Sequence, residues 1–186
     1  MEQLVLNPED YHYLTNISTI SKSSIISEHE NNYQIKAFIP KKINDQNLTI
    51  KYLYDLFGTD PNRFEPCFYN QDWYLNESFT HTPQQIDKWL YFDTKIPKEN
   101  FGILPSKSLI EELPTALELT YVFFLIYLKY NIVLWKNSYL WTSDFDEEKD
   151  QIYVGRYFDE KGLVNNGFSI HRHLSIKNNY GYIKKG

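Results

Sequence analysis

Two histidines near the C-terminal end of the chain, His171 and His173, have the residue type and the spacing that metal chemistry needs. Apolar and polar residues alternate around them, which predicts a strand over 168–176 with both imidazoles on one face. Same-face neighbours on a strand lie about 6.5–7 Å apart. Both rings can therefore reach one zinc-like ion at about 2.0–2.1 Å, provided that a third ligand closes the site.

This His-x-His pair resembles the metal-binding strands of cupins and of several zinc enzymes. The resemblance implies a divalent transition metal as cofactor and a metal-dependent hydrolase or lyase activity. A cupin would carry a Glu a few residues further on, where this chain reads Ser175-Ile176-Lys177-Asn178. The candidates for the third ligand are His81, Asp144 and Asp146. The alternative is a polar sheet face that carries two titratable side chains and no metal.

A second candidate site lies in the segment 68–77, where large aromatic rings are interleaved with amides and acids. Binding surfaces use this mixture of Tyr, Trp and polar neighbours. Its candidate ligand- or partner-binding residues are Tyr69, Asp72, Trp73 and Tyr74. A loop with such rings either buries them in its own core or offers them to a partner. An exposed Trp73 would favour the surface, and burial of Trp73 together with Trp89 would favour the core.

The run 144–150 contains five carboxylates in seven residues and resembles the start of a calcium loop. It departs from that pattern because Lys149 stands where the turn glycine belongs and Gly155 stands where the bidentate Glu belongs. Glu147-Glu148-Lys149 also resembles the acid-x-Lys triplet of metal-dependent nucleases, which lies on a buried strand. We expect a solvated hairpin tip instead, because Asp favours turns and charge discourages edge pairing.

Composition excludes several other classes of protein. The single cysteine, Cys67, rules out an intramolecular disulfide framework and a zinc site built from cysteines. The seven glycines never cluster, so the chain has neither a P-loop nor a dinucleotide fingerprint. The net charge of −5, with 16 of 19 basic residues lysine, disfavours nucleic acid as a partner. The N-terminal residues lack the pattern of a signal peptide and the longest apolar run is too short for a membrane span, so we expect a cytoplasmic protein.

The pattern of elements predicts an α+β fold. Alternation predicts a strand at Tyr33–Ile39, and helical spacing predicts a helix over 49–57 that ends at Gly58. The middle of the chain, 60–105, is loop-rich and aromatic, with one short strand at 89–92. A helix over about 114–130 has almost no polar side and should be buried all round. Period-2 segments at 138–145, 151–158 and 168–176 predict an antiparallel meander against that helix.

These features predict one α+β domain over 1–186, with 1–60 as a candidate N-terminal appendage. The function that they favour is a non-catalytic binding or protein-interaction module, with another protein or a small ligand as its partner. The alternative function is the metal-dependent hydrolase or lyase built on the histidine pair. A bound transition metal would distinguish the two.

Overall fold

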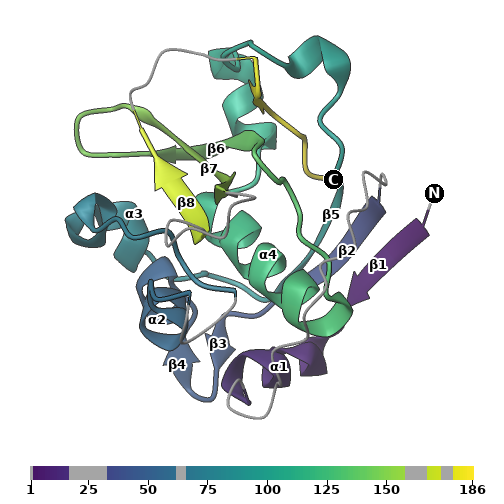
Figure 1. Ribbon diagram of the computed structural model, residues 1–186, viewed down its shortest axis with the longest axis vertical. Helices are drawn as coiled ribbons and strands as arrows, with labels where there is room; N and C mark the ends of the chain where they lie inside the picture. Colours follow the sequence, from purple (N-terminus) through teal and green to yellow (C-terminus); the bar gives the residue numbers. More distant parts are fainter. Residues whose placement is uncertain (1, 17–32, 62–65, 158–166, 173–177) are drawn as a thin grey trace.

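The computed structural model describes residues 2–16, 33–61, 66–157, 167–172 and 178–186. It has the α+β fold that the sequence predicts. A three-stranded and a four-stranded sheet lie on opposite sides of a central helix, α4, and β3 and β4 form a small separate sheet (Figure 1). The strands and helices are, in chain order, β1 Glu2–Leu6, α1 His12–Thr15, β2 Tyr33–Ile39, β3 Lys42–Ile43, β4 Gln46–Asn47, α2 Ile50–Phe57, α3 Ser78–His81, β5 Lys88–Asp93, α4 Ala116–Tyr130, β6 Tyr139–Phe145, β7 Gln151–Tyr157, β8 Gly167–His171 and β9 Tyr180–Gly181. Short 3₁₀ helices add Pro8–Tyr11, Trp73–Asn76, Lys98–Asn100 and Lys107–Glu112.

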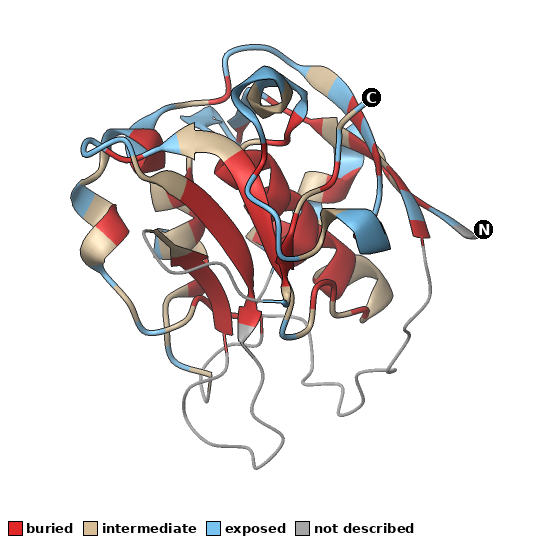
Figure 2. Ribbon diagram, turned by 90° about the horizontal axis from the view of Figure 1, so that it is seen from above, coloured by how far each residue is buried: buried red, intermediate tan, exposed pale blue. Residues whose placement is uncertain are grey.

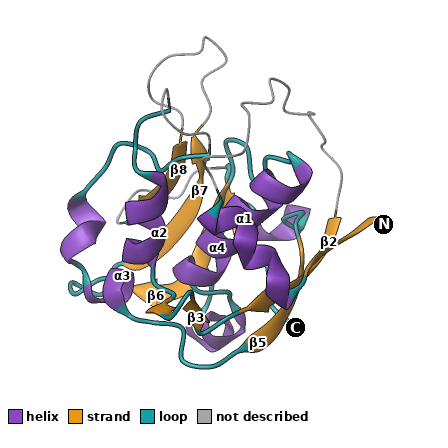
Figure 3. Cartoon of the chain, turned by 90° about the horizontal axis from the view of Figure 1, so that it is seen from below, coloured by secondary structure: helices purple, strands orange, loops and turns teal. Residues whose placement is uncertain are grey.

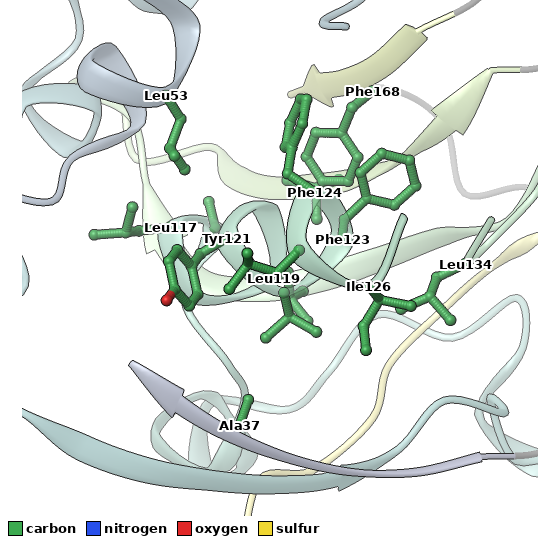
Figure 4. Packing of buried hydrophobic residues seen from close by; sticks show 14 of the residues in the cluster. Ala37, Leu53, Leu117, Leu119, Tyr121, Phe123, Phe124, Ile126, Leu134 and Phe168 are labelled. Atoms are coloured by element: carbon green, nitrogen blue, oxygen red, sulfur yellow. The ribbon is translucent and has the colours of Figure 1, made fainter. Parts of the chain in front are cut away.

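Helix α4 is the centre of the core, as the sequence predicts. Thr115 and Glu118 form a capping box that satisfies the first backbone N–H groups, and Asn131 ends the helix in the left-handed conformation with φ of 55°. Every residue from 116 to 127 is buried. Figure 4 shows why, since Phe168 of β8 packs on one side of the helix and Ala37 of β2 lies on the other. No helix among the described residues is long and apolar enough to span a membrane.

The N-terminal sheet has the strand order β1-β2-β5, with β1 parallel and β5 antiparallel to β2. Strand β2 alternates as expected, and its residues Tyr33, Ile35, Ala37 and Ile39 are buried toward α4. Leu90 and Phe92 of β5 face the same way. Helix α4 packs against this inner face (Figure 3), and the alternation leaves exposed residues on the outer face, as the banded colouring of the strands in Figure 2 shows. The first sixty residues thus contribute to the main core, and the single-domain organisation stays a prediction.

The C-terminal sheet has the order β8-β7-β6-β9, and β6, β7 and β8 form the predicted antiparallel meander. The turn between β6 and β7 is the expected hairpin tip, in which Glu147, Glu148 and Lys149 are exposed. Strand β8 is confirmed as far as His171, and Arg172 after it is no longer in a strand. The remainder of the predicted strand, 173–176 with His173, lies outside the described residues.

The expected polar face of β8 is wrong at Ser169, which is only 1% exposed. Aromatic side chains from the neighbouring strands and from the C-terminal tail cover that face. They form a second hydrophobic cluster of Leu113, Tyr139, Trp141, Tyr153 and Tyr180. Both faces of the C-terminal sheet are therefore buried, and the alternation of residue types along β8 alone does not reveal this.

Candidate functional site

His171 ends β8 at the border of the second cluster. Its ring stacks on Tyr153, with centroids 5.4 Å apart and an interplanar angle of 25°, and meets Tyr139 edge-on at 5.6 Å. The imidazole is half-buried among aromatic rings. These contacts fix the direction of the ring, which a metal ligand would also need.

The three candidates for a third metal ligand each have another role. His81 Nε2 lies 2.7 Å from the carbonyl oxygen of Leu75, and Asp144 accepts a hydrogen bond of 2.6 Å from the backbone N–H of Ala116. Asp146 pairs with Arg172. Across the part of the chain that the structure describes, no three His, Cys, Asp or Glu side chains are grouped closely enough to hold a metal ion. A metal site at His171 would need ligands from outside the described residues, where His173 lies, so the metal stays a prediction.

The segment 68–77 is attached to the C-terminal sheet through Trp73. The indole Nε1 donates a hydrogen bond of 3.1 Å to the carbonyl oxygen of Ile170, and the Arg172 guanidinium lies 4.5 Å from the ring centroid. Tyr74 is buried in the core, where burial raises the pKa of its hydroxyl. Tyr69 is half-buried and Asp72 is exposed. Of the four predicted binding residues, the structure turns Trp73 and Tyr74 inward and leaves Asp72 at the surface.

Arg172 is the residue that holds this contact, and no local sequence pattern marks it. Its Nη1 lies 2.8 Å from Asp146 Oδ2 and 3.3 Å from Glu77 Oε1. The side chain of Asp146 has no exposed surface. Burial is the largest single effect and alone would raise the pKa of Asp146. The hydrogen bond and the charge of Arg172, together with the backbone N–H groups of Asp150 and Glu148, outweigh burial and lower that pKa. An Arg172 cluster therefore connects the middle segment to the hairpin β6–β7. It consists of Arg172, Trp73, Glu77 and Asp146.

A different group of aromatic residues faces solvent, on the outer face of the N-terminal sheet. We call it the aromatic–lysine face. It consists of Lys36, Phe38, Trp89 and Tyr91. Trp89 is 38% exposed and Tyr91 is 39% exposed. Phe38 meets Trp89 edge-on at 5.4 Å, and the Lys36 ammonium lies 4.7 Å from the Trp89 centroid and 5.6 Å from the Tyr91 centroid.

Strand register creates this face. Lys36 pairs with Tyr91, and Phe38 pairs with Trp89. The carbonyl oxygen of Tyr91 accepts a hydrogen bond of 2.8 Å from the N–H of Gly186, away from β2. Lys36 and Tyr91 are therefore a non-hydrogen-bonded pair, the kind whose side chains lie closest. Alternation along β2 and β5 separately marks these residues as outward-facing, but only the pairing brings them together.

A buried carboxylate pair lies at the start of α4. Glu118 has no exposed side-chain surface and forms an ion pair with Lys88. Burial raises the pKa of Asp144 to about 6, and the charge of Glu118 adds to this effect. Both carboxylates accept hydrogen bonds from backbone N–H groups of the first turn, Asp144 from Ala116 and Glu118 from Thr115. This is the arrangement of a structural helix cap.

Comparison with known proteins found no relative. No protein-family model, no curated protein and no solved structure matches the chain. The choice among the candidate sites therefore rests on the geometry and chemistry of the chain itself.

Proposed function

We propose that this chain is a non-catalytic binding module that contacts another protein through the aromatic–lysine face. The observation that carries the proposal is that Trp89 and Tyr91, 38% and 39% exposed, lie at successive same-face positions of β5. Large aromatic side chains are costly to leave in water and are enriched at the energetic centres of protein interfaces. Together with Phe38 they make a contiguous apolar surface on two neighbouring strands.

The aromatic–lysine face fits binding better than catalysis. The four residues of the face include no histidine and no carboxylate, and their cation is a lysine stacked on the rings. The nearest acid along β5, Asp93, lies one same-face position beyond Tyr91. A flat β-sheet surface also gives a partner a rigid platform, because β2 is held between β1 and β5. A preformed platform loses little conformational entropy on binding.

A photo-crosslinking experiment in the cells that express the chain tests the proposal. Tyr91 is replaced by photoreactive benzoylphenylalanine, and a second version carries the same replacement at Phe145, which is 38% exposed at the end of β6. We expect illumination to link position 91 to one defined polypeptide that mass spectrometry identifies. The adduct should disappear when Trp89→Ser is added.

The control decides between specific and non-specific contact. The same set of adducts from positions 91 and 145, or an adduct at 91 that survives Trp89→Ser, would contradict the proposal. Both Tyr91 and Trp89 lie at the surface, so circular dichroism of each variant should match that of the original chain.

A further inference from the structure

The aromatic–lysine face has a cation at its centre. In the sheet register Lys36 is flanked by Val5 of β1 on one side and Tyr91 of β5 on the other. Phe38 is the next residue of β2 on the same face, and Gln34 is the previous one. Within the described part of the chain, no carboxylate lies within ion-pair distance of the Lys36 ammonium.

A partner that covers this face must supply an anion to pair with the Lys36 ammonium. Transfer of an ammonium group from water to an apolar interface is strongly unfavourable unless an anion accompanies it. The two aromatic rings under Lys36 compensate for only part of the lost hydration. A wholly apolar partner would therefore bind poorly, and a partner with an anion above Lys36 would bind well.

A carboxylate of a polypeptide is the anion that the chain favours. A nucleic acid binds through several phosphate contacts, and this face offers one ammonium on a chain with a net charge of −5. A second copy of the chain would bring its own Lys36 to the interface, so two ammonium groups would have to be neutralised. The one carboxylate of β2 and β5 on that face, Asp93, lies beside Gln34 and not beside Lys36. A peptide can place one carboxylate above Lys36 without bringing a second ammonium group into the interface.

The spacing of residues along β2 determines which side chains of a bound peptide can contact the face together. Lys36 and Phe38 are successive residues on the same side of β2, so their backbone positions lie about 6.5–7 Å apart. The Lys36 ammonium itself lies 4.7 Å from the Trp89 centroid. An extended peptide has the same repeat. Its side chains at positions one and three can lie above Lys36 and above the Phe38–Trp89 pair at the same time.

Resting on the proposed function, we infer that the occupant of the aromatic–lysine face is an extended peptide segment with Asp or Glu two residues from a large apolar side chain. The carboxylate pairs with the Lys36 ammonium. The apolar side chain packs on the edge-to-face pair of Phe38 and Trp89.

Selection from a library of random twelve-residue peptides tests this inference. The library is selected separately on the full chain, on Lys36→Glu and on the control Lys107→Glu, an exposed lysine on the 3₁₀ helix Lys107–Glu112. We expect the original chain and the control to enrich an acid two residues from an aromatic or large aliphatic residue. Lys36→Glu should instead enrich Lys or Arg at the acidic position. For one synthesised peptide, Lys36→Glu should weaken binding at least tenfold.

The outcomes separate this inference from the proposed function. Peptides that bind Lys36→Glu as well as the original chain, or that carry no acid, would overturn the inference, while their loss on Trp89→Ser would still support the face as a binding surface. Peptides indifferent to both changes would overturn both. An absence of any enriched peptide, tighter binding of a single-stranded oligonucleotide than of every peptide, or dimerisation abolished by Lys36→Glu would each show that the occupant is not this peptide.

Discussion

Single residues in this chain owe their chemistry to the depth at which the fold places them. Tyr74 and Tyr121 are ordinary phenols by sequence, yet burial raises the pKa of both hydroxyls. Asp144 and Asp146 are two residues apart in one acidic run, and their pKa values shift in opposite directions. The Asp144 carboxylate, from β6, accepts the Ala116 N–H at the start of α4, and this hydrogen bond and the charge of Lys185 only partly offset its burial. Asp146 has the Arg172 guanidinium beside it.

The raised pKa of Asp144 predicts a pH dependence of stability. The folded chain holds this proton up to a pH of about 6, against an ordinary value of 3.8. The stability that Asp144 contributes is therefore fully present below pH 3.8 and is lost as the pH rises through about 6. Asp144→Asn removes the titration and keeps an oxygen for the Ala116 N–H. We expect its free energy of unfolding, relative to that of the original chain, to rise by about 1–3 kcal/mol between pH 4 and pH 7.

Urea unfolding at several pH values measures this difference. Asp93→Asn, at an exposed position on β5, controls for the loss of a surface carboxylate. A difference between Asp144→Asn and the original chain that is the same at pH 4 and pH 7 would show that burial does not disfavour the charged form of Asp144.

The histidine pair gives a second test at this scale, on which the alternative function depends. If His171 and His173 hold a metal, protein purified without a chelator or an affinity tag should contain about one zinc-like ion per chain. The double change His171→Ala and His173→Ala should then abolish metal binding, as measured by elemental analysis. Metal-free protein that also takes up no added zinc would remove the hydrolase or lyase alternative, since that chemistry has no other predicted centre.

At the scale of elements, α4 determines how the rest of the chain is arranged. Its apolar residues surround the helix on all sides, so both sheets can pack against it at once. Phe124 stacks on Phe57 of α2 with centroids 4.1 Å apart, and Phe123 lies 4.6 Å from Phe168 of β8. One helix thus links α2 and β8, which are far apart in the sequence.

The burial of α4 predicts a large effect of truncating its side chains. Leu125 has no exposed surface, so Leu125→Ala loses the burial of its side chain and leaves a cavity. We expect a loss of about 2–5 kcal/mol in the free energy of unfolding, measured by chemical denaturation. Leu104→Ala is the matched control, because Leu104 is 48% exposed and its truncation should change stability by less than about 0.5 kcal/mol. Equal effects of the two changes would contradict the central position of α4.

At the scale of the whole molecule, the chain half-buries Trp73 against one sheet and leaves Trp89 and Tyr91 exposed on the other. In the Arg172 cluster, the guanidinium pairs with Glu77 and Asp146 and packs on Trp73, which holds Trp73 against the C-terminal sheet. Trp89 and Tyr91 belong to the same aromatic middle of the chain, and although the Lys36 ammonium lies over both rings, they remain 38% and 39% exposed. The binding surface that we propose is therefore on the other sheet from the one that the sequence pattern of 68–77 suggested.

The sequence by itself determined the α+β class, the strand Tyr33–Ile39, the helix over 49–57, the buried central helix and the C-terminal meander. These follow from local periodicity and capping, which act over a few residues. Only the tertiary structure decided which aromatic rings face solvent. Trp89 and Tyr91 meet Lys36 and Phe38 through a strand pairing that spans some fifty residues, and Ser169 is covered by side chains from other strands. Periodicity shows that a strand has two faces, but burial of either face depends on what packs against it, and that is a property of the whole chain.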